Sequence, residues 1–497
     1  MRYHFSQAII ENILKTFSYP FAKNTYNFQE PPQDFYPISF FEHRLVEDPF
    51  DAFMRLDGFQ YKKAKNTLDR YGIPYTAEQE RKARVFYEVT EMMEKQKTDF
   101  VAMYVENIKD TDIVNLSDTN YILTTENTIE VSRKLNLIPV HKTTNNVLFE
   151  GKLDKRILNE KEQLEAIKTC LKYQVSCLIG GAGTGKSFVT SQIIEQLSLN
   201  RKNVAILAPT HKAKESLQKK IKKGTVDTVH KYGHGFGITG DVVVVDEAGM
   251  LSTDLMKSIL KRGNENTQYI FVGDKNQLPP VGYGRPFELI QERFHTYEIK
   301  KNRRSESPDI IALGREILGI PQNANMHHNN IEMVDNVEQA YKHGAEVVLS
   351  FTNKNVAEIN EQRRLKTGVY SISKKFRIGE KIISKTNNSK EGYYNGQLFE
   401  VIGFSEIKNI NTGKIIRLKK DLDLEYNFDY AYALTVHKSQ GSEWDVVAYQ
   451  PSERDSQNIA YVAVTRAKKR LIIIGDGLKE VYPPERKWRQ LHESYRV

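Results

Sequence analysis

The fold is decided by residues 175–200, VSCLIGGAGTGKSFVTSQIIEQLSLN, where a short apolar run leads through a glycine-rich turn into a segment typical of a helix. GGAGTGKS matches the Walker A pattern G-x-x-x-x-G-K-[ST], in the strand-turn-helix context that the pattern requires. Such glycines let backbone N–H groups wrap a phosphate chain, and the helix dipole adds to the attraction. The sequence therefore predicts a nucleotide site in which Lys186 reaches the β- and γ-phosphates and Ser187 binds Mg²⁺. The residues expected around the phosphates are Gly180, Gly181, Ala182, Gly183, Thr184, Gly185, Lys186 and Ser187.

Short β-branched runs recur on both sides of this stretch, with helical patterns between them. Strands that are continuously apolar, rather than alternating, indicate a parallel sheet covered on both faces. We therefore expect an α/β fold with two such domains in tandem. The first series of runs is 175–179, 204–207, 242–245 and 269–272, and the second is 346–351, 432–435, 446–449 and 471–474. Residues 372–430 have a different texture, with an Asn395-Gly396 turn, and predict an inserted antiparallel barrel whose aromatics Tyr393, Tyr394 and Phe399 are more often core residues than base-stacking platforms.

Two strand ends carry further candidates for chemistry. Asp246 and Glu247 follow the run at 242–245, so Asp246 is expected near the Mg²⁺ and Glu247 where it orients and deprotonates a water molecule. Taken alone, this pair could also be a helix N-cap. The run at 269–272 ends in GDKNQLPPV, residues 273–281, where Gln277 is placed to sense a γ-phosphate without competing for the metal.

The region before residue 150 is less informative. Residues 1–45 are rich in Phe, Tyr and Pro and are expected to form an irregular cap, and residues 46–150 are expected to form a helical domain and linker. GFQYKKA at 58–64 looks like a degenerate helix-hairpin-helix, but Gln60 stands where a second glycine is usual, so a plain helical module is the favoured interpretation. Residues 120–150 read as a linker with one strand pair.

Charge, cysteine content and hydropathy bound the function. The chain has 497 residues and a formal net charge of +9; residues 1–150 carry 18 basic and 22 acidic side chains, and the remainder carries 54 and 41. A polyanionic partner is therefore expected on the C-terminal two thirds. Cys170 and Cys177 lack zinc-ligand spacing and are expected to be buried thiols. No apolar run reaches the ~20 residues of a membrane span, so we expect a cytoplasmic protein with no membrane partner.

From about residue 158 to the end, the ordered motifs resemble superfamily 1 helicases, most closely the RecD-like, 5′-to-3′ subgroup (superfamily 1B) that includes phage Dda. This resemblance implies two tandem RecA-like P-loop domains, an inserted SH3-like β-barrel and an N-terminal, mostly helical region. The implied boundaries are 151–300 for domain 1A with a very short 1B hairpin near 231–241, 301–371 and 431–497 for domain 2A, and 372–430 for domain 2B. The motifs that carry it are the segment around Gln163, the Walker A loop, APTHKA at 208–213, TVDTVH at 225–230, Asp246-Glu247, residues 273–281, KNRRS at 301–305, ALTVHKSQGSEWD at 433–445 and YVAVTRA at 461–467.

The resemblance also implies the roles of individual residues. ATP would lie between the two RecA-like domains, with Gln163 reading the adenine and Gly441 and Glu443 also at the nucleotide. Arg466 would be the arginine finger of the second domain, and either Arg303 or, preferred by spacing, Arg304 would bind the γ-phosphate. The implied catalytic set is Lys186, Asp246, Glu247, Gln277, Arg304 and Arg466.

Single-stranded DNA would cross both domains, held by small donors that contact phosphate without reading bases, so binding should be salt-dependent and largely sequence-independent. Each donor could instead cap a strand end, and His230 and His437 could be core histidines. The implied DNA contacts are Thr210, His211, Thr228, His230, Asn353, Thr435, His437 and Lys438.

The implied function is that of an ATP-dependent DNA helicase, a monomer acting on single-stranded and forked duplex DNA with replication, recombination or repair proteins as partners. The short 1B segment, which holds Phe236, leaves a translocase that remodels protein–DNA complexes without separating strands as an alternative. A P-loop kinase or nucleotide switch is disfavoured by the motifs at 273–281, 433–445 and 461–467.

Overall fold

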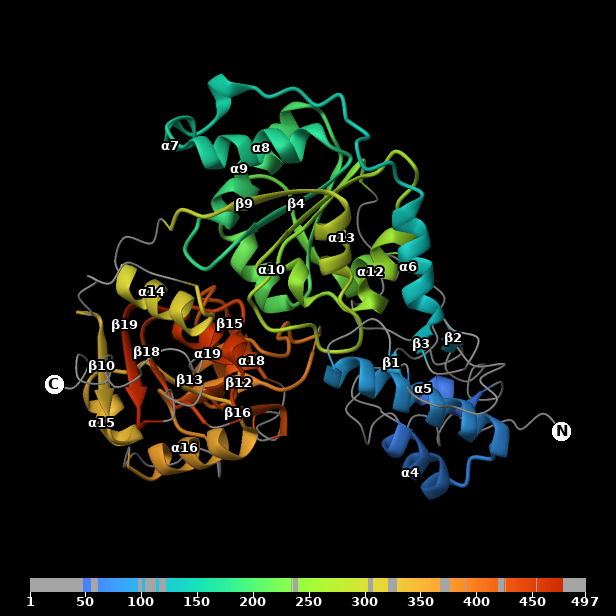
Figure 1. Ribbon diagram of the computed structural model, residues 1–497. Helices are drawn as coiled ribbons and strands as arrows, with labels where there is room; N and C mark the ends of the chain where they lie inside the picture. Colours follow the sequence, from blue (N-terminus) through green and yellow to red (C-terminus); the bar gives the residue numbers. More distant parts are fainter. Residues whose placement is uncertain are drawn as a thin grey trace.

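The computed structural model describes residues 48–54, 61–96, 101–102, 113–115, 122–233, 235, 240–302, 307–320, 329–366, 376–388, 390–418, 424, 426–452 and 454–476. It confirms the α/β class with two parallel sheets, and Figure 1 shows the unit built on the first sheet, in green, between the second unit, in orange and red, and the N-terminal helices, in blue. Within this part of the chain no helix combines the length and apolar character needed to cross a membrane. The predicted cap at residues 1–45 and the Gly58–Gln60 turn lie outside the described residues.

The first sheet has six strands, all parallel. Alternate residues of one strand serve opposite faces: Val242 and Val244 pack with one group of helices, and Val243 and Val245 with the other. This double coverage is why the strand is apolar without interruption. In order across the sheet the strands are β6 (Val226–Thr228), β5 (Val204–Ala208), β7 (Val242–Val245), β8 (Gln268–Gly273), β4 (Val175–Gly180) and β9 (His295–Ile299).

Helices cover this sheet on both sides. One face carries α7 (Lys155–Leu158), α8 (Lys161–Lys172), α9 (Lys186–Leu199) and α10 (His211–Gln218). The other carries α6 (Glu126–Asn136), α11 (Val229–Gly233), α12 (Thr253–Arg262) and α13 (Pro286–Arg293). Cys170 and Cys177 are buried free thiols, as expected, and burial raises the pKa of Cys170 to about 12.

The second sheet is also wholly parallel, with five strands. Its strands in order are β10 (Ile331–Val334), β19 (Ala467–Ile474), β18 (Trp444–Tyr449), β11 (Val347–Ser350) and β17 (Ala433–Thr435). Helices α14 (Pro308–Ile317) and α19 (Gln457–Val464) pack on one face, and α15 (Val337–Lys342) and α16 (Asn353–Lys366) on the other. The short helix α18 (Val436–Ser439) follows β17 directly.

An antiparallel sheet of five strands stands between α16 and β17, in the interval where the sequence predicts an inserted barrel. Its own core includes Tyr393, Phe399 and Phe428, each fully buried. Asn395 and Gly396 make a turn in which Gly396 has φ +83°, a value that favours glycine. The strand order is β15 (Ile415–Arg417), β14 (Glu406–Asn409), β13 (Leu398–Gly403), β12 (Lys381–Ser384) and β16 (Phe428–Tyr430).

The N-terminal part contains α3 (Pro49–Met54), α4 (Tyr61–Tyr71) and α5 (Ala77–Gln96), then a small antiparallel sheet of β1 (Val101–Ala102), β3 (Ile122–Thr125) and β2 (Ile113–Asn115). The prediction of a linker over 120–150 is wrong for residues 126–136, which form α6. Thr125 caps this helix by accepting from the Thr128 N–H, and Val131 and Leu135, four residues apart, bury one side of it.

The predicted hairpin near residues 231–241 starts differently from expectation. Residues 231–233 complete helix α11, because Thr228 accepts a hydrogen bond from the Lys231 N–H and Tyr232 is buried under α12. Residue 234 and residues 236–239, including Phe236, lie outside the described residues.

Candidate functional site

The candidate site forms where three neighbouring strands end. Strands β4, β8 and β7 lie side by side and parallel, so the Walker A loop, Asp274 and Asp246 emerge at one edge of the sheet. Ligands of open parallel sheets bind at this edge, beyond the carboxyl ends of the strands. The sequence therefore positions these residues through strand order alone.

The Walker A loop is a closely packed turn. Gly183 and Gly185 have φ values of +77° and +89°, which L side chains rarely adopt. A Cβ on Gly180 would lie 2.7 Å from the Thr184 Oγ1 and 2.8 Å from the Ile299 carbonyl, so only glycine fits there. Lys186 Nζ folds back over the loop and donates to the carbonyls of Gly180 (2.5 Å) and Gly181 (3.0 Å). The ammonium group therefore lies at the Walker A loop, where it can also donate to phosphate oxygens.

Asp246 is the buried carboxylate of the site, at 8% exposure. Burial, and after it the negative charge of Glu247, raise its pKa to about 6. Glu247 itself has φ +52°, in the left-handed region. The adjacent Ser187 hydroxyl accepts a hydrogen bond from Lys220 Nζ at 3.2 Å. Lys220 is exposed and has no place in any motif, so sequence reasoning missed it.

A divalent cation suits this pair. Burial and the charge of Glu247 both disfavour the ionised form of Asp246, so a positive ion beside it would stabilise that form. Asp246 and the Ser187 hydroxyl also supply the oxygen ligands that Mg²⁺ prefers. Among the residues that the structure describes, no cluster of three or more His, Cys, Asp or Glu could hold a metal.

Helix α8 and the segment after β9 lie near the Walker A loop and are joined to each other. Gln163 lies on α8 and is buried, at 2% exposure. The neighbouring Glu162 and Glu160 accept from the backbone N–H and Nζ of Lys301 at 3.0 and 2.9 Å. Asn302 Nδ2 then donates to the Ala182 carbonyl at 3.1 Å. The predicted alternatives Arg303 and Arg304 come next in the chain and lie outside the described residues.

The second unit reaches this edge through α19. The Tyr461 hydroxyl accepts from the Ala182 N–H (3.1 Å) and donates to Asp274 Oδ2 (2.9 Å). One turn earlier on the helix, Asn458 Nδ2 donates to the carbonyls of Asn276 (3.0 Å) and Gln277 (3.3 Å). These cross-unit contacts were not foreseen, although their three-residue helical spacing was visible in the sequence.

Arg466 is buried, at 6% exposure, and its guanidinium hydrogen-bonds backbone carbonyls of its own unit. Nε donates to the Val462 carbonyl (3.1 Å) and Nη1 to the Ser442 carbonyl (3.3 Å). Gly441, in the same motif region, has φ +73° and packs against α10, where a Cβ would lie 3.5 Å from the Ala213 nitrogen. Glu443 is exposed.

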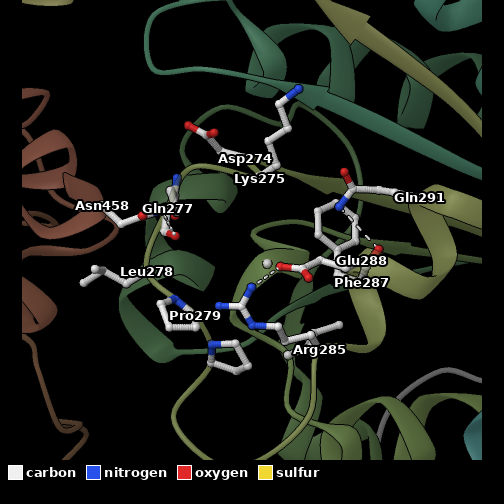
Figure 2. Close-up of a pocket in the computed structure, with 13 residues that line it drawn as sticks. Asp274, Lys275, Gln277, Leu278, Pro279, Arg285, Phe287, Glu288, Gln291 and Asn458 are labelled. Atoms are coloured by element: carbon white, nitrogen blue, oxygen red, sulfur yellow. Dashed lines mark hydrogen bonds and ion pairs between the residues drawn. The ribbon is translucent and has the colours of Figure 1, made fainter. Parts of the chain in front are cut away.

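Gln277 borders a cavity of about 270 Å³ between the loop after β8 and helix α13. Figure 2 shows Asn458 approaching the Gln277 backbone from the second unit, while Arg285 pairs with Glu288 at 2.5 Å on the opposite wall. The Gln277 loop is thus held from both units, and its side chain sits beside the cleft between them.

The predicted DNA contacts divide into caps and exposed side chains. Three of the predicted contacts cap a helix: a backbone N–H in the first turn donates to the hydroxyl of Thr210, Thr228 or Thr435. Such capping is the alternative role that the sequence had left open for these residues. A hydroxyl that accepts still has its proton to donate, so capping and phosphate contact are compatible. The side chains with outward exposure are His230, Asn353, His437 and Lys438.

His211 makes a different contact. Its ring stacks on Tyr394 of the antiparallel sheet, with centroids 3.8 Å apart and planes at 6°. Burial, followed by the charges of Lys214 and His230, lowers the pKa of His211 to about 3, so the ring is neutral at pH 7. Next to it on α10, Glu215 accepts from Gln397 Nε2, a second contact between the first unit and the antiparallel sheet.

Residues 158–339 match the AAA domain family, and residues 430–474 match the UvrD-like helicase C-terminal domain. The chain is 27% identical to the ATP-dependent RecD2 DNA helicase of Deinococcus radiodurans over 64% of its length and 49% of that protein. It is 23% identical to the RecBCD enzyme subunit RecD of Buchnera aphidicola, over 66% of this chain and 75% of that one. An uncharacterized protein of Methanocaldococcus jannaschii is 26% identical, over 76% of this chain and 44% of that protein. Several of these relatives are therefore about twice as long as the matched region.

Among solved structures, Bacteroides Pif1 bound to single-stranded DNA gives a TM-score of 0.47 at 18% identity, covering 68% of this chain and 96% of that chain.

Proposed function

Because the chain belongs to the superfamily 1B, RecD-like helicases, we propose that it is an ATP-dependent DNA helicase that moves 5′ to 3′ on single-stranded DNA. The observation that carries the proposal is the contact between the two units at the Walker A loop. A Walker A loop with Lys186, Ser187 and Asp246 on one parallel-sheet unit faces α19 of a second such unit across direct hydrogen bonds. A nucleotide bound there touches both units, so hydrolysis can move one against the other.

In this proposal the first unit binds ATP and Mg²⁺. Lys186 and the loop N–H groups hold the phosphates, Ser187 and Asp246 hold the metal, and Glu247 orients the attacking water. A Mg²⁺ ion held by Ser187 and Asp246 would neutralise negative charge on the phosphates. The Gln277 side chain senses the γ-phosphate, and Gln163 contacts the base. Arg466, and Arg304 before α14, complete the charge stabilisation when the units close.

The proposed architecture assigns residues 151–300 to a RecA-like domain 1A and residues 301–371 with 431–497 to domain 2A. The antiparallel sheet within 372–430 is proposed to be an SH3-like 2B domain, supported by its position between α16 and β17 and by its separate core. Single-stranded DNA is proposed to cross α10, α11, α16 and α18, at or near whose starts the predicted contacts lie; the exposed ones are on α11, α16 and α18. The protein is proposed to act as a monomer on forked DNA.

The proposal is tested by ATP turnover with and without single-stranded DNA. We expect strong stimulation by DNA, and its loss in Lys186→Ala. Lys168→Ala is the matched control, because Lys168 is an exposed lysine paired only with Glu165 on α8. Turnover that does not respond to DNA in the unaltered protein would refute the proposal. Forks with only a 5′ or only a 3′ tail then report the polarity.

A second candidate function is a DNA-stimulated translocase that remodels protein–DNA complexes with little strand separation. The observation that favours it is the short interval between α11, which ends at Gly233, and β7, which starts at Val242, because it leaves little chain for a strand-separating hairpin. Displacement of streptavidin from biotinylated single strands, without unwinding of a 5′-tailed duplex, would select this candidate. Efficient unwinding of that duplex would exclude it.

A further inference from the structure

Tyr461, on helix α19 of the second unit, contacts the Walker A loop. Its hydroxyl accepts from the Ala182 N–H at 3.1 Å and donates to Asp274 Oδ2 at 2.9 Å, so both hydrogen-bonding directions are used. Tyr461 and Asp274 are buried, at 4% and 3% exposure. The hydrogen bond between Tyr461 and Asp274 joins two buried groups and is therefore strongly oriented, because neither group has water as an alternative.

Glycines make room for this tyrosine at both ends. A Cβ on Gly181 would lie 3.1 Å from the Tyr461 hydroxyl, and a Cβ on Gly314 would lie 3.3 Å from the ring at Cδ2. Gly314 is in the middle of α14, where glycine costs about 1 kcal/mol relative to alanine. The ring therefore sits in a fitted slot, and the hydroxyl position follows from the position of the second unit.

The Ala182 peptide is held on both sides. Tyr461 binds its N–H and Asn302 binds its carbonyl, at 3.1 Å each. Ala182 belongs to the loop that would turn its N–H groups toward a nucleotide's phosphates. A change in the conformation of this loop therefore acts directly on the Tyr461 hydroxyl.

Tyr461 is also tied to Arg466. Thr465 Oγ1 donates to the Tyr461 carbonyl at 2.7 Å, and Arg466 Nε donates to the Val462 carbonyl at 3.1 Å. The tyrosine and the arginine are thus fixed to the same helix end, one reaching the loop and the other turned toward its own unit.

We propose that Tyr461 is a positioning residue that couples the Walker A loop to Arg466: its hydroxyl fixes helix α19 against Ala182 and Asp274, so that the state of the loop sets how Arg466 approaches the nucleotide. The proposal rests on the proposed ATPase function. It assigns Tyr461 no contact with the reacting atoms. Its effect is on the chemical step and on DNA stimulation, with nucleotide affinity almost unchanged.

The test uses Tyr461→Phe, which removes the hydroxyl and keeps the ring in its slot. We expect the DNA-stimulated kcat for ATP hydrolysis to fall about tenfold and KM for ATP to change less than about threefold. Tyr449→Phe is the matched control. Tyr449 is buried in the same unit, and its hydroxyl donates to Asp455, a residue of that same unit. Thermal unfolding of both variants measures the structural cost of losing a buried Tyr–Asp hydrogen bond.

A loss of kcat in Tyr461→Phe, at a melting temperature similar to that of Tyr449→Phe, supports the proposal. A kcat and a DNA stimulation within twofold of the unaltered protein overturn it, as does an equal loss in Tyr449→Phe. If the unaltered protein shows no DNA-stimulated turnover, the proposed function fails instead, so the two failures are distinguishable.

Discussion

The ammonium nitrogen of Lys212 donates a 2.7 Å hydrogen bond to the Lys438 carbonyl and so joins the two parallel-sheet units. Lys212 is 5% exposed, and its nitrogen also lies 5.7 Å from the centre of the Trp444 ring. Burial, and after it the charge of Arg466, lower the pKa of Lys212 to about 7, while Glu215 opposes the shift. This lysine is an inter-unit contact that carries an electrostatic penalty.

Lys212→Met is expected to stabilise the protein by about 1–4 kcal/mol at pH 6, because a buried charge is replaced by an apolar chain of similar volume. The folded-state pKa of Lys212 lies below its unfolded value of 10.5, so the unfolded state binds more protons between pH 7 and about 10. The unaltered protein therefore gains stability over this range, and the advantage of the variant shrinks. Denaturant unfolding at pH 6 and pH 9 measures this. An equal advantage at both values would contradict the prediction, and Lys168→Met should show none.

Tyr394→Ala is expected to raise the pKa of His211 toward 6.5, because the stacked ring supplies much of the burial that keeps the imidazole neutral. Tyr394→Phe keeps the ring and should keep the pKa low. Since the folded-state pKa is lowered, the stability that comes from neutral His211 is present above about pH 6.5 and is lost as the pH falls toward 3. The His211 imidazole signals in an NMR titration distinguish the variants. Loss of the stack should cost about 0.5–1.5 kcal/mol.

Tyr283→Ala is expected to release the N-terminal helices from the first unit. The Tyr283 hydroxyl donates to Asp254 (2.7 Å) and accepts from Asn127 (3.0 Å), and its ring packs edge-on against Phe86 of α5, with centroids 6.3 Å apart. The loss should be about 3–5 kcal/mol of local stability, read as faster hydrogen exchange in α5. Tyr75→Phe is the control, because its hydrogen bond to Asp69 is exposed, and it should change stability by less than about 0.5 kcal/mol. Unchanged exchange in α5 would refute the anchoring role.

Asp246→Asn is expected to lower ATP turnover by about 100-fold or more and yet raise the stability of the nucleotide-free protein by about 1–2 kcal/mol. The stability gain follows because the buried carboxylate beside Glu247 loses its charge. Glu247→Gln should also lower turnover, with a smaller gain, because the Glu247 side chain is less buried than that of Asp246. Steady-state kinetics and thermal unfolding check the two effects separately. If Asp246→Asn were less stable than the unaltered protein, the prediction that the Asp246 charge destabilises the nucleotide-free fold would be wrong.

The central strands could be predicted from the sequence, while the edge strands β9 and β10 could not. Strand Val242–Val245 is buried on both faces and is therefore apolar throughout, a pattern typical of a central parallel strand. His295–Ile299 and Ile331–Val334 lie at sheet edges, bury only some of their residues, and so lack that pattern. Helix α6 was missed for a similar reason, since only Val131 and Leu135 of its residues are buried.

Within the candidate site, local motifs located the Walker A loop and Asp246 because a strand and its following turn fix both. The role of Tyr461 could not be predicted in this way. Its partners Ala182 and Asp274 belong to the other unit, and their approach depends on how two sheets dock. Lys220 was missed because it reaches Ser187 from a segment without any motif.

The present hydrogen bonds of Arg466 bear on how often the site can cycle. An arginine has five N–H donors, and two of those of Arg466 serve the Val462 and Ser442 carbonyls. In the proposed function the guanidinium turns toward phosphate oxygens, so it exchanges these two acceptors for new ones, and the free energy of engagement is a difference between similar quantities. The two carbonyls can take the donors back once the phosphate has gone, which would favour release of the spent nucleotide in the proposed cycle.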